Sequence, residues 1–109
     1  FQQWDLWLTP TLASPPVALG TFDFDVSDIE ERASEVWSHI PFTPLCNGTG
    51  LPAMSVPLYW NADNLPIGAH FVAPFGDEAT LYRLASQLEQ ARPWQAKRPA
   101  VHAYGDAAR

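Results

Sequence analysis

Apolar residues in this chain gather into short runs separated by turn-forming residues, and the clearest pair of runs lies between residues 53 and 73. Ala53–Trp60 predicts a short buried strand. Asn61–Pro66 is a turn cluster, and Ile67–Ala73 predicts a second strand, antiparallel to the first because the connection is so short. Pro57 cannot donate a ladder hydrogen bond, so it indicates an edge position, a bulge or a bend.

The clearest helical pattern follows this hairpin. Glu78–Ala91 is predicted to be a helix that Pro93 ends. Its three leucines would contribute about 4–9 kcal/mol of gross burial if a sheet or another helix covers them. The apolar face consists of positions spaced i, i+3, i+4 and i+7: Leu81, Leu84, Ala85 and Leu88.

An earlier helix is predicted from about Asp28 to Ser38. Ser27 and Glu30 have the spacing of a capping box, in which each side chain satisfies a free backbone donor of the other residue. Pro41 stops this helix. Its predicted apolar side contains Ile29, Ala33, Val36 and Trp37.

The remaining segments are short or irregular. Leu6–Thr9 is an apolar run before a proline and predicts a short strand covered on both faces. Ser14–Pro16 is expected to be extended loop, because a residue that precedes proline avoids the helical region. Phe42–Leu51 is expected to be loop or a single helical turn, and Gln95–Arg109 a polar tail.

Composition supports a folded domain and limits the classes of macromolecule that it could bind. Hydrophobic residues make up 47% of the 109 residues and charged residues 17%, which argues against disorder. The formal net charge of −6 makes nucleic acid an improbable partner, because nucleic-acid affinity depends largely on clustered Lys and Arg. No apolar run is long enough for a membrane span, and no signal peptide is recognisable.

Cys46 is the only cysteine, which excludes an internal disulfide and favours a reducing cytoplasm. The chain begins with Phe1 rather than Met, so we expect that it was processed or cut from something longer.

The candidate chemistry within these residues is sparse. His39, His70 and His102 lack the spacing of a zinc site, so we expect no metal and no cofactor. His70 is expected to be a hydrogen-bonded structural histidine on its strand. Serines and aspartates are present, but without a Gly-x-Ser-x-Gly elbow they are interpreted as cap and loop residues. Cys46 is interpreted as a small buried thiol rather than a nucleophile, because no base can be named for it.

Four blocks in order and in register carry a resemblance. They resemble the C-terminal end of the amidase-signature family, and the Thr9–Pro16 start and Arg92–Trp94 ending are most similar to 6-aminohexanoate cyclic-dimer hydrolases and related bacterial amidases. The blocks are Asp5–Ala13, Pro41–Pro57, Leu65–Ala73 and Asp77–Ala85.

The resemblance implies the α/β class and, more narrowly, a C-terminal fragment of an α/β/α fold. This fragment would contain two main helices and short strands of a mixed, mainly parallel sheet. Residues 1–94 would be an incomplete amidase domain and 95–109 a tail. The family hydrolyses amides with a Ser–cis-Ser–Lys triad that lies upstream of this region, and Lys97 matches none of its positions. No catalytic residue is therefore assigned.

The loop that borders the acyl pocket in relatives corresponds to Pro44, Cys46, Asn47 and Gly48, which are candidates to line a substrate site. An alternative is that this loop only packs the sheet edge.

Three hypotheses follow for the chain itself. The first is the C-terminal part of an amidase, silent alone, which acts on a small-molecule amide in the full-length enzyme and self-associates when isolated. The second is a stand-alone, non-catalytic module for binding or assembly. The third is a small hydrolase that uses Cys46, or a serine with a histidine.

Overall fold

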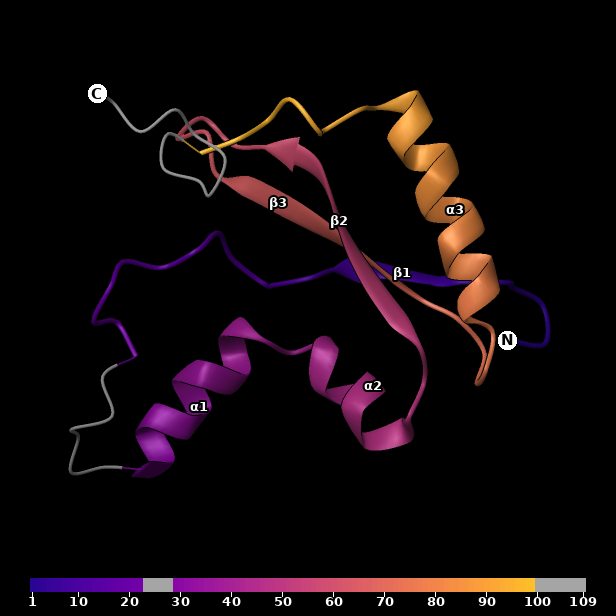
Figure 1. Ribbon diagram of the computed structural model, residues 1–109. Helices are drawn as coiled ribbons and strands as arrows, with labels where there is room; N and C mark the ends of the chain where they lie inside the picture. Colours follow the sequence, from indigo (N-terminus) through magenta and orange to yellow (C-terminus); the bar gives the residue numbers. More distant parts are fainter. Residues whose placement is uncertain (23–28, 100–109) are drawn as a thin grey trace, which may run out of the picture.

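The computed structural model describes residues 1–22 and 29–99 and shows a small α/β arrangement (Figure 1). Helix and strand predictions at residues 53–91 are confirmed to within one residue. The predicted capping serine, Ser27, lies outside the described residues. The elements in chain order are β1 (Trp7–Pro10), α1 (Ile29–His39), α2 (Thr43–Thr49), β2 (Ala53–Trp60), β3 (Pro66–Val72) and α3 (Glu78–Ala91).

The three described strands form one antiparallel sheet in the order β1-β3-β2. The predicted antiparallel hairpin of β2 and β3 is confirmed. The register of this hairpin shifts between Pro57 and Tyr59, at the edge strand β2. Of the alternatives predicted from Pro57, an edge position, a bulge or a bend, the edge position is present, and the register is irregular at this point.

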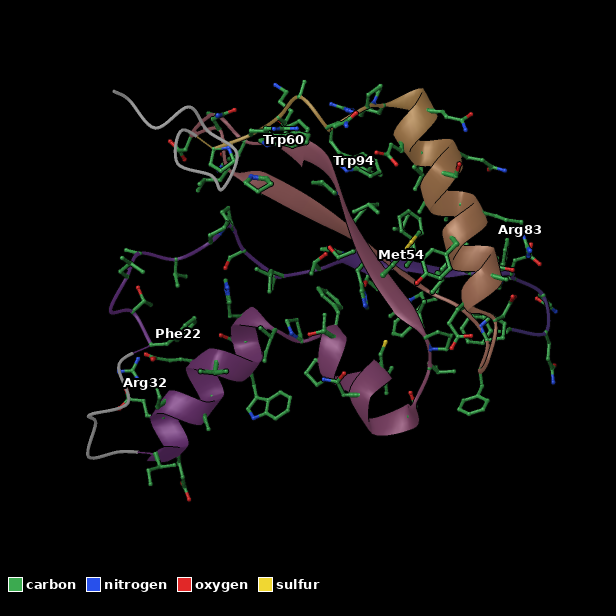
Figure 2. All side chains as sticks on the ribbon, in the orientation of Figure 1. Phe22, Arg32, Met54, Trp60, Arg83 and Trp94 are labelled. Atoms are coloured by element: carbon green, nitrogen blue, oxygen red, sulfur yellow. The ribbon has the colours of Figure 1, made fainter. Side chains whose placement is uncertain are left out.

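One face of the sheet is covered by α3. The Asp77 carboxylate caps this helix by accepting hydrogen bonds from the Thr80 backbone N–H and hydroxyl, at 3.3 and 2.7 Å. Figure 2 shows Met54 between β2 and α3. The core between them consists of the buried residues Val56, Phe71, Ala73 and Leu81, with Leu84, Leu88 and Trp94 packed against them. The leucine face predicted from the helical period is thus the face that packs.

The predicted apolar side of α1 is real but uncovered. Ile29 is 78% exposed and Trp37 58% exposed, and α1 has no buried residue. What holds α1 is the preceding loop: Arg32 donates to the Thr21 carbonyl at 2.7 Å, and the Ala13 N–H donates to the His39 carbonyl at 3.0 Å. Figure 2 shows Arg32 and Phe22 together beside α1.

The expectation that β1 is buried on both faces is wrong for this chain. The strand spans Trp7–Pro10, one residue later than predicted, and Leu8 is 61% exposed. The reason is its position: β1 pairs only with β3 and forms the other edge of the sheet. An apolar run indicates that a strand favours burial, but it does not determine whether another element packs over both faces of that strand.

The segment predicted as loop or a single turn contains the seven-residue helix α2. Pro44 lies in its first turn, where a proline is favoured because its fixed φ suits a helix start. Gly50 ends it with φ of 70°, and the Gly50 N–H donates to the Cys46 carbonyl. Within the described residues, no helix has the length and apolar character needed to cross a membrane.

Replacement of Leu81 with Ala tests the packing of α3. Leu81 is 5% exposed in the core, so L81A should lower the free energy of unfolding by about 2–4 kcal/mol, through lost burial and a residual cavity. Urea denaturation followed by circular dichroism measures this. The matched control is the neighbouring Tyr82→Ala, where the side chain is exposed and the loss should stay below about 0.5 kcal/mol. Equal losses for the two variants would contradict the packing.

Candidate functional site

The four candidate residues carried by the resemblance all lie on α2. Cys46 is buried, Pro44 is half-buried, and Asn47 and Gly48 are exposed. None of these residues lines the three cavities described below. Cys46 is a free, buried thiol, as expected from the sequence.

The sheet face opposite α3 contains a set of polar side chains beside the buried Val72. Side chains alternate across a strand, so Phe71 faces α3 and His70 faces the other side, where Figure 1 shows α1 and α2. Thr9 and Ser55 stand opposite His70 on the two neighbouring strands. These three residues therefore form a polar row across the sheet.

His70 is confirmed as a structural histidine. Its side chain is only 4% exposed, and its Nδ1 lies 3.0 Å from the Thr9 hydroxyl in a hydrogen bond. Burial lowers the pKa of His70 below the ordinary value of 6.5, because desolvation disfavours the charged imidazolium. Within the row, the hydrogen bond between His70 and Thr9 joins β3 to β1.

A second polar pair lies one step along the same face. The hydroxyls of Thr11 and Ser55 lie 2.6 Å apart, and the Thr11 N–H donates to the Gly68 carbonyl at 3.1 Å. A Cβ at position 68 would come closer than 3.0 Å to both hydroxyl oxygens, so this close approach requires glycine. The pair lines a hollow of about 290 Å³ together with Pro57 and Pro66. Two hydroxyls at the rim of a hollow are able to hydrogen-bond an amide or a carboxylate.

A serine–histidine contact also occurs, between Ser14 and His39. The Ser14 hydroxyl lies 2.6 Å from His39 Nδ1, beside a cavity of about 470 Å³ that Glu35 also lines. A triad needs a group that orients the second ring nitrogen and donors for an oxyanion. In residues 1–22 and 29–99 no carboxylate bonds the His39 ring, and the carboxylate of Glu35 is paired with Arg32. The contact ties the end of α1 to the loop at Ser14.

The sequence did not indicate these polar contacts. Ser14–His39 and Thr11–Ser55 join residues that are 25 and 44 positions apart, and no local motif marks either pair. The described part of the chain also contains no group of three or more His, Cys, Asp or Glu side chains that could hold a metal ion.

Comparison with known proteins identifies a family and several relatives that this chain matches. A family model described as Amidase matches residues 1–82. The chain is 43% identical over 94 residues to the Mycobacterium leprae protein named "Putative amidase AmiC". The matched region covers 86% of this chain and 20% of that protein. It is 38% identical over 101 residues to the 6-aminohexanoate-cyclic-dimer hydrolase of Paenarthrobacter ureafaciens. This match covers 88% of this chain and 20% of the hydrolase.

The fold shows the same correspondence. A solved structure of 6-aminohexanoate cyclic dimer hydrolase superposes with a TM-score of 0.79 at 37% identity, covering 88% of this chain and 21% of that chain. The chain therefore spans about a fifth of the length of the relatives it matches.

The buried imidazole of His70 makes stability depend on pH. Because its pKa is lowered in the folded state, the unfolded chain takes up the proton first as pH falls below about 6.5. Stability should therefore be highest above that pH and should decrease as pH falls towards the folded pKa, by no more than about 1.4 kcal/mol per pH unit.

Urea denaturation between pH 7.5 and 5.5 measures this slope. His70→Gln, which keeps a hydrogen-bonding group without a titrating ring, should flatten it. If His70→Gln is folded and keeps the full slope, the assignment to His70 is wrong.

Proposed function

The chain belongs to the amidase family, and on that premise we propose that it is the C-terminal segment of an amidase, a hydrolase of the carbon–nitrogen bond of amides. One observation carries this proposal: most of the chain superposes at a TM-score of 0.79 and 37% identity on part of a 6-aminohexanoate cyclic dimer hydrolase. The match of the family model over residues 1–82 supports the same conclusion.

The proposed role of this segment is to complete a sheet and one wall of a site, not to supply the nucleophile. Among the described residues, the two serine–histidine and threonine–histidine contacts lack the further groups of a catalytic triad. The ammonium of Lys97 lies over the Trp60 ring, 5.5 Å from its centroid. The nucleophile, the second serine and the lysine of the Ser–cis-Ser–Lys type would come from residues outside this chain.

The substrate proposed for the whole enzyme is a small-molecule amide, linear or cyclic. The hydroxyl pair of Thr11 and Ser55, which opens onto a hollow, has the hydrogen-bonding capacity to contact an amide. Asn47 and Gly48 are exposed on α2. The proposal places the acyl-binding wall there, with no cofactor and in the cytoplasm, which the single cysteine favours.

A segment exchange tests the proposal. Residues 1–94 would replace the corresponding fifth of the Paenarthrobacter ureafaciens 6-aminohexanoate-cyclic-dimer hydrolase, and hydrolysis of the cyclic dimer would be measured. We expect activity within about 100-fold of the parent, because small displacements of a site cost up to that much. The isolated chain should hydrolyse nothing.

A Gly68→Val version of the same chimera is the control. It should lose folding or activity, because a side chain at position 68 collides with the hydroxyls of Thr11 and Ser55. A chimera that folds with the parent's melting temperature yet shows no hydrolysis would count against the proposal. Hydrolysis by the isolated chain would overturn the assignment of a silent segment.

We also propose that the isolated chain self-associates. The alternative hypothesis, a stand-alone module for binding or assembly, also predicts self-association. The surfaces that favour association are the uncovered side of α1, with Ile29 and Trp37, and the edge strand β1, with Leu8 exposed. Pro10 and Pro57 each remove a ladder donor from an edge strand, which directs association towards α1.

Light scattering after size exclusion at increasing concentration measures this association. Ile29→Gln with Trp37→Gln should weaken the dimer at least tenfold, through the loss of two apolar side chains from the contact. Tyr82→Gln is the control, because Tyr82 is equally exposed but lies on α3. A monomer at every concentration up to about 100 μM, far above the Kd of a stable dimer, would contradict this proposal.

A further inference from the structure

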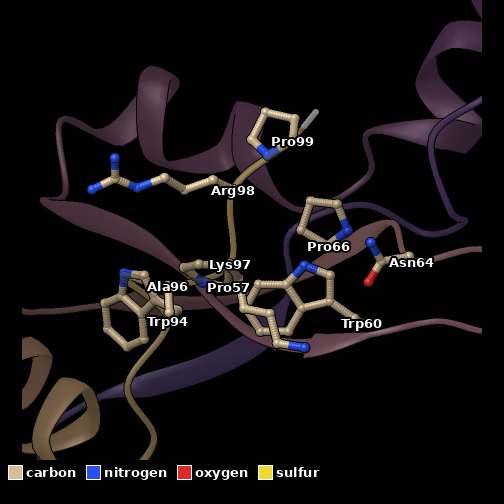
Figure 3. A pocket seen from close by; sticks show the side chains of 9 residues that line it. All are labelled: Pro57, Trp60, Asn64, Pro66, Trp94, Ala96, Lys97, Arg98 and Pro99. Atoms are coloured by element: carbon tan, nitrogen blue, oxygen red, sulfur yellow. The ribbon is translucent and has the colours of Figure 1, made fainter. Parts of the chain in front are cut away.

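A cavity of about 430 Å³ lies where the β2–β3 hairpin turn meets the segment that follows α3 (Figure 3). Its walls are flat and apolar: Trp60 and Trp94 are two of them, and Pro57, Pro66 and Pro99 are others. This volume is in the range of small-ligand sites and accommodates one substituted aromatic ring. Neither the hydroxyl pair on the sheet nor α2 contributes to it.

Both turns that build this cavity are fixed by hydrogen bonds. In the hairpin turn, the Asn61 side-chain carbonyl accepts from the backbone N–H groups of Asp63 and Leu65 at 3.0 and 2.8 Å. After α3, Trp94 packs against the core, and the Lys97 N–H donates to the Trp94 carbonyl at 2.8 Å, which turns the chain back towards the hairpin. The walls are therefore held in place before any ligand arrives.

The cavity is also locally cationic. Lys97 and Arg98 both line it, and none of its lining residues is acidic. The Lys97 ammonium lies over the Trp60 ring, and Arg98 Nε donates to the Gln95 carbonyl at 3.4 Å. Across residues 1–22 and 29–99, the terminal guanidinium nitrogens of Arg98 have no protein partner. In a chain of net charge −6, two cations beside two indoles, with no ion pair to either cation among the described residues, are a distinct local feature.

We propose that this cavity binds a small aromatic carboxylate. The ring stacks against the indoles of Trp60 and Trp94, since aromatic pairs prefer offset or edge-to-face contacts. The carboxylate takes the fork of Arg98, whose planar donors match its two oxygens, and the nearby Lys97 ammonium adds a second positive charge. The inference does not rest on the proposed amidase function, because the cavity is formed by residues of this chain alone.

Titration with benzoate tests the proposal directly on the ¹⁵N-labelled chain. The chain has five tryptophans, and their indole N–H signals report on five separate places. Benzoate should shift the Trp60 and Trp94 signals with a Kd in the millimolar range, while Trp4, Trp7 and Trp37 stay unchanged. Benzamide, which keeps the ring but lacks the charge, should bind about tenfold more weakly, and acetate, which lacks the ring, should cause no shift.

The charge requirement is tested with Lys97→Gln/Arg98→Gln, which should weaken benzoate binding about tenfold. The matched control is Arg83→Gln/Arg92→Gln, which removes the same number of positive charges from residues that do not line the cavity. It should bind benzoate as the unmodified chain does. Unchanged signals from Trp4, Trp7 and Trp37 establish that each variant is folded.

Three results would overturn the proposal. The first is equal binding of benzoate and benzamide, which would leave the cations without a role. The second is equal binding by Lys97→Gln/Arg98→Gln and the unmodified chain. The third is shifts spread over all five tryptophan signals, which would show non-specific contact with exposed aromatic rings.

Discussion

The whole arrangement depends on β3, the strand between the other two. It is the only described strand paired on both sides, and its end supplies Phe71 and Val72 to the buried interior, with Ala73 directly after it. Through Phe71 it receives the leucine face of α3, and through His70 and Gly68 it organises the polar face. If β3 were displaced by one residue, these two sets would exchange sides, and both the core and the polar row would be lost together.

The elements that could be predicted from the sequence are those determined by residues within a single segment. β2, β3 and α3 were predictable because their periodicity, turn residues and caps lie within each segment. For α1 the periodicity identified the apolar side correctly, yet that side is exposed, since a pattern does not contain the surface that will cover it. The helix α2 was missed because it depends on a cooperating pair, Pro44 at its start and Gly50 at its end, rather than on an amphipathic pattern.

The candidate sites were predictable to a smaller degree. The structural role of His70 followed from its strand position. Three other features depend on sheet register or on chain reversal and have no local signature: the Ser14–His39 contact, the Thr11–Ser55 pair and the cavity between Trp60 and Trp94. The family resemblance directed attention to α2, whereas the three cavities described above are lined by other residues.

The close approach at Gly68 has a consequence for how sequences of this kind diverge. Two hydroxyls occupy the space that a side chain at position 68 would need. A larger residue at position 68 becomes acceptable only after Thr11 and Ser55 have both become smaller, a route that passes through a cavity. The reverse order passes through a steric clash. The three positions should therefore change as a group in descendants of this chain, although Thr11 follows β1 and Ser55 lies on β2, two strands that do not pair with each other.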